Sequence, residues 1–202
     1  GVGTPWVFDL LEVAAWRFGG IARAGEGEDF DPDQLTPKER LDWYRGEQEK
    51  AVADYTKAIE LDPHNAHVYV KRGEIHLEQE RWEQAAADFA KAIELEPKQW
   101  PLWKARAEKF AQSEQWDEAI TVYTKIIDHN SDDGELFQAR AAAHIALKQW
   151  EKAIEDYGQI VKLRPDDAEA WSQRGQACFH ARQWDRAIDD CTQAIELRPD
   201  DA

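Results

Sequence analysis

The apolar and small residues of this chain recur at a fixed spacing of 34 residues. One column of the repeat is aromatic, one is small, one is always tryptophan and one is always alanine. These columns are Tyr69, Trp103, Phe137 and Trp171; Gly73, Ala107, Ala141 and Gly175; Trp82, Trp116, Trp150 and Trp184; and Ala85, Ala119, Ala153 and Ala187. A proline closes most units, but Ser131 takes its place in one of them. The spacing predicts a repeat protein whose units run without insertion from residue 66 onward.

Each unit is predicted to form two antiparallel helices. Trp171, Gly175 and Cys178 lie four and three residues apart, which places them on one stripe of a first helix. Small residues such as Gly175 let two helix backbones approach closely, and the closing proline stops the second helix. The expected helices are 66–79 and 82–95, 100–112 and 116–129, 134–147 and 150–163, and 168–181 and 184–197. A single pair cannot bury both of its apolar faces, so we expect neighbouring pairs to stack into a solenoid.

These columns resemble the tetratricopeptide repeat, in which aromatic, glycine, alanine and proline positions follow one another in this order over 34 residues. The resemblance covers residues 32–202 and implies an all-α, right-handed α-solenoid of antiparallel helix pairs that binds proteins. It divides the chain into an N-terminal part, 1–31, and five repeats. The repeats are 32–65 (degenerate), 66–99, 100–133, 134–167 and 168–201. The QW motif followed by DEAI or EKAI is similar to bacterial members of the family.

Residues 1–31 are predicted to contain an apolar helix and a linker rich in glycine and acidic residues. Thr4 and Pro5 begin this helix, and Gly19 and Gly20 end it. Its length, about fourteen residues, argues against a membrane span, which needs about twenty. Exposed apolar side chains favour docking on a partner or on the protein itself. The docking side chains are Trp6, Phe8, Leu10, Leu11, Trp16 and Phe18. Thr36 to Glu39 then form a capping box that starts the degenerate repeat, whose second helix is expected over 49–61.

Composition and chain ends narrow the choice of partner and compartment. The net charge of −16 argues against a nucleic-acid ligand, because phosphates are bound by clustered Lys and Arg. Both cysteines, Cys178 and Cys191, fall in core columns, so we predict a buried, reduced pair and a cytoplasmic protein. The sequence starts at Gly1 and contains no methionine, so its natural N-terminus is expected to be missing. Its last residues, RPDDA, also precede a repeat at Ala168, so we expect a fragment or a covered last face.

No group of residues predicts catalysis, a cofactor or a metal. His76 and His144 share a core column with Phe110 and Cys178, which favours buried packing over catalysis. The sequence has no glycine-rich phosphate loop, no HExxH motif and no nucleophile–histidine–carboxylate pattern. We therefore predict that the protein is not an enzyme.

A concave groove built from the first helices is the predicted binding surface. It consists of first-helix residues that lie outside the core columns and vary between repeats. They are Val70, Lys71, Glu74, Glu78, Lys104, Glu108, Gln112, Gln138, Ala142, Ile145, Ser172, Gln176, Phe179 and His180. The lysines lie toward the N-terminal side, and Ala142, Ile145 and Phe179 form an apolar floor. This arrangement favours a peptide or helix with an acidic anchor followed by apolar residues.

A Lys and Asn clamp binds acidic chaperone tails in the best-known subclass of the family. At the matching places this chain has Val70, Glu74, Ala105, Glu169 and Gln173, which argues against that client. Three functions remain open: a scaffold for a protein partner, a targeting or regulatory part of a larger enzyme, and a self-assembly module. The last would oligomerise through the N-terminal helix and the uncapped face near the C-terminus.

Charged residues beside the core are expected to be paired. Arginine recurs in the middle of each first helix, and aspartate in the middle of most second helices. We predict that each arginine pairs with the aspartate of the preceding repeat. The pairs would be Arg72–Asp54, Arg106–Asp88 and Arg174–Asp156, with Arg140 facing Val122 and lacking an ion pair.

Overall fold

The computed structural model of the chain describes residues 36–198, and every regular element in that range is helical. The chain divides into two compact units, Gly1–Asp54 and Tyr55–Ala202. The boundary between the units lies inside the first described helix, α2 (Pro37–Leu61). The predicted apolar helix and linker lie outside the described residues.

The start of α2 confirms the predicted capping box. The backbone N–H of Thr36 donates to Glu39 Oε2 at 3.0 Å, and the backbone N–H of Glu39 donates to Thr36 Oγ1 at 3.4 Å. The helix then continues for 25 residues, so the helix break expected before Glu49 is wrong. Two residues account for this difference. Gln48 stands where other second helices begin with tryptophan, and Glu39 replaces the small residue that lets paired helices approach.

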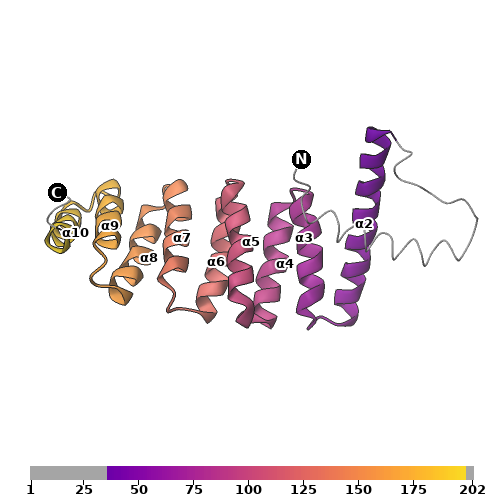
Figure 1. Cartoon of the computed structure of the whole chain (residues 1–202), viewed down its shortest axis with the longest axis horizontal. Coiled ribbons are helices and arrows are strands. Elements are labelled where there is room, and N and C mark those ends of the chain that lie inside the picture. The colour runs from indigo at the N-terminus through magenta and orange to yellow at the C-terminus, as the bar shows by residue number, and fades with distance from the viewer. Residues whose placement is uncertain (1–35, 199–202) are drawn as a thin grey trace, which may run out of the picture. The chain divides into compact units, whose positions relative to one another are not determined.

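Residues beyond α2 form consecutive antiparallel helix pairs, which follow one another in chain order (Figure 1). The pairs are α3 (Ala66–Glu78) with α4 (Trp82–Leu95), α5 (Trp100–Gln112) with α6 (Trp116–His129), α7 (Gly134–Ala146) with α8 (Trp150–Leu163), and α9 (Ala168–His180) with α10 (Trp184–Leu197). A short 3₁₀ helix, η2 (Pro97–Gln99), precedes α5. These helices confirm the helix boundaries predicted from the 34-residue spacing to within one residue.

Small residues bring the two helices of a pair into close contact, as predicted. A Cβ atom added to Gly73 would lie 2.9 Å from Phe89 Cε1, and one added to Gly175 would lie 3.0 Å from Cys191 Sγ. Both contacts join a first helix to the second helix of its own pair. The other two residues of this column are alanines that are fully buried. The two helices of a pair therefore pack closely, because the side chain at their contact is no larger than the methyl group of alanine.

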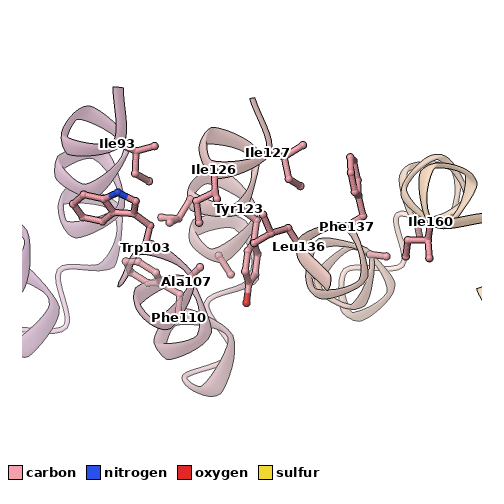
Figure 2. Packing of buried hydrophobic residues seen from close by; sticks show 14 of the residues in the cluster. Ile93, Trp103, Ala107, Phe110, Tyr123, Ile126, Ile127, Leu136, Phe137 and Ile160 are labelled. Atoms are coloured by element: carbon pink, nitrogen blue, oxygen red, sulfur yellow. The ribbon is translucent and has the colours of Figure 1, made fainter. Parts of the chain in front are cut away.

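The stacked pairs share one continuous hydrophobic core. Trp103, Phe110, Tyr123, Ile126 and Leu136 are all at most 2% exposed. Figure 2 shows these side chains, together with others from α4 to α8, pointing into the same layer between the helices. Each first helix contributes to this layer beside the second helix of the preceding pair, so the core is continuous across the boundaries between pairs.

Each turn within a helix pair contains one residue in the left-handed region. These residues are Glu80, Glu114, Lys148 and Arg182, with φ between 57° and 61°. The next backbone N–H closes the turn: Gln149 N–H, for example, donates to the carbonyl of His144 at 2.8 Å. This conformation costs an ordinary L-residue about 1–2 kcal/mol, and glycine adopts it freely. The turns are therefore strained in the same place in every pair.

We expect Lys148→Gly to raise the free energy of unfolding by about 1 kcal/mol, because glycine removes the left-handed strain at the end of α7. Urea unfolding monitored by circular dichroism would measure the change. The matched control is Gln159→Gly inside α8, which should lower the stability by about 1 kcal/mol. Equal destabilisation by the two substitutions would contradict the assignment of strain to this turn.

Candidate functional site

A buried ion pair joins the two helices of three of the four described pairs. Arg72 binds both carboxylate oxygens of Asp88, with nitrogen–oxygen distances of 2.9 and 2.6 Å. Arg140 binds Asp156 at 3.0 and 2.6 Å, and Arg174 binds Asp190 at 2.8 and 2.6 Å. The three aspartates are at most 4% exposed. Two parallel hydrogen bonds to a planar guanidinium compensate for burying the charges.

The predicted pairing with the preceding repeat is therefore wrong. In an antiparallel pair, the middle of the first helix crosses the middle of the second, and Arg72 and Asp88 are the seventh residues of α3 and α4. Each arginine thus meets the aspartate 16 residues later. Contact with the preceding second helix still exists, but it is made to threonine: Arg72 Nη1 donates to Thr56 Oγ1 at 3.0 Å. Arg140 makes the same bond to Thr124 at 3.1 Å.

A second polar residue of the first helix faces each buried aspartate. His76 Nε2 lies 4.0 Å from Asp88, and His144 Nε2 lies 3.9 Å from Asp156. In the last pair, Cys178 Sγ lies 3.9 Å from Asp190. Burial lowers the pKa of His144 and raises the pKa of the Cys178 thiol, so both groups are held in their neutral forms. Burial of both histidines in the core was predicted and is confirmed.

The α5–α6 pair uses a different arrangement. Val122 stands in place of the aspartate, and the residue facing it is Phe110 instead of histidine. Arg106 turns away from α6 and donates to Glu74 of α3, 32 residues earlier in the chain. Its guanidinium also lies 5.4 Å from the ring centroid of Trp103. The sequence alone indicates this difference, because the aspartate and the polar residue that faces it are both replaced by apolar residues in the same repeat.

Two ion pairs connect first helices of successive helix pairs. The first is Arg106–Glu74, which links α5 to α3. The second is Lys104–Glu135, at 2.5 Å, which links α5 to α7. The Glu135 carboxylate raises the pKa of Lys104, and Lys104 lowers the pKa of Glu135. These contacts place α3, α5 and α7 next to one another, so their outward side chains belong to one surface.

All the predicted groove residues lie at or near the surface. Those that are exposed are Glu78, Glu108, Gln112, Gln138, Ala142, Gln176, Phe179 and His180, and those that are half-buried are Val70, Lys71, Glu74, Lys104, Ile145 and Ser172. Val70 and Ile145 owe their partial burial to packing against the hydrophobic core.

Each of the two lysines expected to anchor a partner lies near a carboxylate of the protein itself. Lys71 lies 3.4 Å from Glu74, and Lys104 is paired with Glu135, so neither lysine lacks an acidic partner. Glu108 is exposed. An acidic residue of a partner would therefore have to displace a carboxylate of the protein itself. The acidic anchor stays a prediction, in which a carboxylate of the partner competes with Glu74 and Glu135 for these lysines.

Phe179 and His180 lie in an apolar cavity of about 620 Å³ on the last helix pair. Trp184, Ile188 and Ile195 line the same cavity, whereas Ala142 and Ile145 do not. The Phe179 and Trp184 rings pack edge to face, with centroids 5.2 Å apart. Of the predicted apolar floor, Phe179 thus lies in this cavity, and Ala142 and Ile145 lie outside it.

The two cysteines also differ from expectation. Cys178 is buried, as predicted, but Cys191 is exposed, and both are free thiols. Cys191 occupies the column of Phe89, Tyr123 and Tyr157, which are all buried. No described helix follows α10, and so none covers Cys191 in the way that later pairs cover the three aromatic residues.

Within residues 36–198, no cluster of histidine, cysteine and acidic side chains has an arrangement that would hold a metal ion. The helices of that range are also too short or too polar to cross a bilayer. The predicted docking residues Trp6, Phe8, Leu10, Leu11, Trp16 and Phe18 lie outside it.

Models of one repeat family match three successive parts of the chain. A model described as TPR repeat matches residues 43–80, and two described as tetratricopeptide repeat match residues 76–143 and 140–202. Together they span residues 43–202. Among curated protein sequences, none matches the chain.

Several solved structures are similar to the chain. The crystal structure of MamA protein has a TM-score of 0.50 at 18% identity, over 77% of this chain and 85% of MamA. YrrB, described as a TPR protein with an unusual peptide-binding site, has a TM-score of 0.48 at 22% identity, over 79% of this chain and 82% of YrrB. The first TPR domain of human RPAP3 has a TM-score of 0.46 at 31% identity, over 52% of this chain and 82% of that domain. The similarity to MamA is a similarity of fold alone.

The α5–α6 pair has Val122 and Phe110 where other pairs have an aspartate and a polar residue. We predict that the α7–α8 pair can be converted to the same apolar arrangement. We expect Asp156→Val to cost about 3–5 kcal/mol, because it leaves Arg140 and His144 beside an apolar side chain. Adding His144→Phe should recover at least about 1 kcal/mol, a coupling typical of residues in one network. Glu108 lies 32 residues before Arg140, as Glu74 lies before Arg106, and would accept the released guanidinium.

Urea unfolding of the two single variants and the double variant would measure this coupling. As a control, Glu108→Gln added to the double variant should remove the recovered stability. Strictly additive costs for Asp156→Val and His144→Phe would contradict the coupling.

His144 predicts a pH dependence of stability. Because burial lowers its pKa in the folded state, the unfolded chain binds a proton at higher pH than the folded chain does. The stability linked to this group is present above the unfolded pKa, about 6.5, and is lost as pH falls below that value. We expect His144→Cys, which copies Cys178 of the α9–α10 pair, to reduce the loss of unfolding free energy between pH 7.5 and 5.5. An unchanged loss in chemical denaturation at the two pH values would contradict this role.

Proposed function

Because the chain belongs to the tetratricopeptide repeat family, we propose that it is a non-catalytic scaffold that binds a peptide or a helix of a protein partner. The binding surface is the row of first helices, α3, α5, α7 and α9. The exposed residues of these helices, including Glu108, Gln112 and Gln138, lie outside the repeated core columns. They contribute little to the core, and their variation between repeats suits them to recognise one partner at successive points.

The observation that carries this proposal is the pair of contacts that join the first helices. Arg106–Glu74 and Lys104–Glu135 hold α3, α5 and α7 together through side chains at the edge of the surface. A row of helices held in this way is pre-organised, so a partner loses less free energy to ordering the protein when it binds. Recognition is then performed by the side chains that these ion pairs do not use.

The partner's chemistry follows from those remaining side chains. Glu108 is exposed, and Gln112 and Gln138 present amides that both donate and accept hydrogen bonds. Ala142 is exposed and small, which leaves room for a larger residue of the partner. A partner with a basic residue opposite Glu108 and polar groups opposite the two glutamines fits this surface. The net charge of −16 adds a long-range attraction for such a partner.

Site-specific photo-crosslinking of the full chain tests the proposal. A photoreactive amino acid at Gln138 on α7 should give a defined adduct with a protein partner in a lysate of the source cell. The same amino acid at the exposed Thr121 on α6 should not. The identified partner would then be titrated against the unmodified chain and two arginine variants. We expect Gln138→Arg to weaken binding at least tenfold and Thr121→Arg to leave it unchanged.

Equal crosslinking from both positions, or equal affinity of both variants, would locate the binding surface elsewhere. Charge reversal separates the partner's chemistry from its location. Glu108→Lys should weaken binding of a basic partner and should strengthen binding of an acidic one.

A further inference from the structure

Another cavity, of about 630 Å³, is lined by residues of α8, α9 and the start of α10. Ile154, Val161 and Trp171 give it apolar walls, and Gly158 in the middle of α8 contributes backbone alone. Here it is called the Gly158 cavity. Its volume far exceeds the roughly 30 Å³ that one water molecule takes in the liquid, so it has room for a side chain of a partner. None of the predicted groove residues lines it, so it is separate from the surface proposed above.

Packing within the protein does not require a glycine at position 158. A Cβ atom added to Gly158 would meet one other side chain within 4 Å, namely Arg174 Nη1 at 3.9 Å, which is an ordinary contact. A Cβ atom added to Gly73 or Gly175 would instead approach a neighbouring side chain to 3.0 Å or less. Glycine also destabilises the interior of a helix. Gly158 therefore leaves open a space that a side chain of α8 could have filled.

Threonine stands at this place of the repeat in two earlier units, as Thr56 and Thr124. Each of them accepts a hydrogen bond from Nη1 of the arginine 16 residues later, at 3.0 and 3.1 Å. Arg174 is the corresponding arginine of α9. Its Nε and Nη2 bind Asp190, but no residue in the range 36–198 accepts a hydrogen bond from its Nη1. The loss of the threonine hydroxyl at Gly158 thus leaves one donor of this guanidinium for an acceptor from outside.

The guanidinium of Arg174 is held in place for such an acceptor. Two hydrogen bonds to the buried aspartate fix it on one side, and its central carbon lies 4.6 Å from the ring centroid of Trp171. The corresponding distances in the two units with threonine are 6.0 and 5.7 Å. We propose that a threonine of a partner protein inserts its side chain into the Gly158 cavity. Its hydroxyl oxygen accepts from Arg174 Nη1, as the hydroxyl of Thr124 does from Arg140, and its methyl group contacts Trp171.

The rim of the cavity favours a protein segment as the source of this threonine. Glu151, Glu155, Lys162 and Arg186 line the cavity and are exposed. An apolar centre with a charged rim is the usual anatomy of a protein–protein interface. The two glutamates precede Gly158 on α8, and Lys162 follows it one turn later. A segment that lies along α8 therefore fits best with a basic residue on one side of its threonine and an acidic residue on the other.

A pair of small probes tests the proposal on the full chain. N-acetylthreonine N-methylamide is a threonine flanked by two peptide groups, and the valine derivative has nearly the same shape without the hydroxyl. Each would be titrated into the isotope-labelled chain while NMR follows the indole N–H of Trp171 and the Nε–H of Arg174. We expect the threonine derivative to shift both signals. It should reach half-saturation at a concentration at least about threefold lower than the valine derivative, because it alone supplies an acceptor for Nη1.

Matched variants locate the site. Gly158→Thr places the hydroxyl on the protein itself, and both Gly158→Thr and Gly158→Val should abolish the shifts by filling the space. Gly158→Thr should also unfold at a higher urea concentration than Gly158→Val, because only threonine gives Arg174 Nη1 an acceptor. Lys152→Thr, on an exposed position of α8 outside the cavity, should leave probe binding unchanged. Gln138→Arg in the proposed groove should do the same, so that failure of the groove and failure of this site are distinguishable.

Three outcomes would overturn the proposal. Equal half-saturation with the two derivatives would mean that the cavity accepts apolar groups without recognising the hydroxyl. Shifts that persist in Gly158→Thr would mean that the derivative binds elsewhere. No shift up to the solubility limit of the threonine derivative would mean that solvent alone fills the cavity.

Discussion

Each helix pair in this protein leaves one apolar face that only the next helix can cover. Ile154 and Val161 are buried because α9 follows α8, whereas the matching residues of α10 are exposed. Stability in such an array is a sum of terms within pairs and terms between neighbours, and the hydrophobic core continues across the pairs from α3 to α10. The same requirement explains the exposed cysteine and the apolar cavity of the last pair.

Polar side chains in this core determine which surfaces fit together. A buried carboxylate is costly unless its hydrogen bonds are satisfied, so Asp88 fits only opposite an arginine in the right place. The α5–α6 pair keeps the same helix arrangement with Phe110 and Val122 in the polar places, and Arg106 bonds to a neighbouring pair instead. One backbone thus accepts two internally consistent sets of side chains. A mixture of the two sets would leave a buried charge without a partner.

The sequence predicted the helices much better than their contacts. Helix ends follow from residues that recur every 34 positions, and those signals are local. Asp54 and Asp88 are one full period apart, so the repeat spacing cannot distinguish them as partners of Arg72. Only the crossing of antiparallel helices selects Asp88. Lys104 of α5 likewise forms an ion pair with Glu135 of the next helix pair. The repeat spacing does not reveal that contact, so Lys104 is predicted from the sequence to be available to a partner.

The row of first helices and the apolar cavity of the last helix pair differ in their physical chemistry. On the row of first helices, lysine and arginine are used to hold neighbouring helices together, and the carboxylate of Glu108 and two amides remain for a partner. Recognition there depends on hydrogen bonds and charge, which confer specificity more than affinity. The cavity lined by Phe179, Trp184 and Ile188 offers mainly apolar area, which confers affinity through burial. Phe179 of α9 lies in this cavity and also belongs to the predicted groove, so the two surfaces meet at the last helix pair.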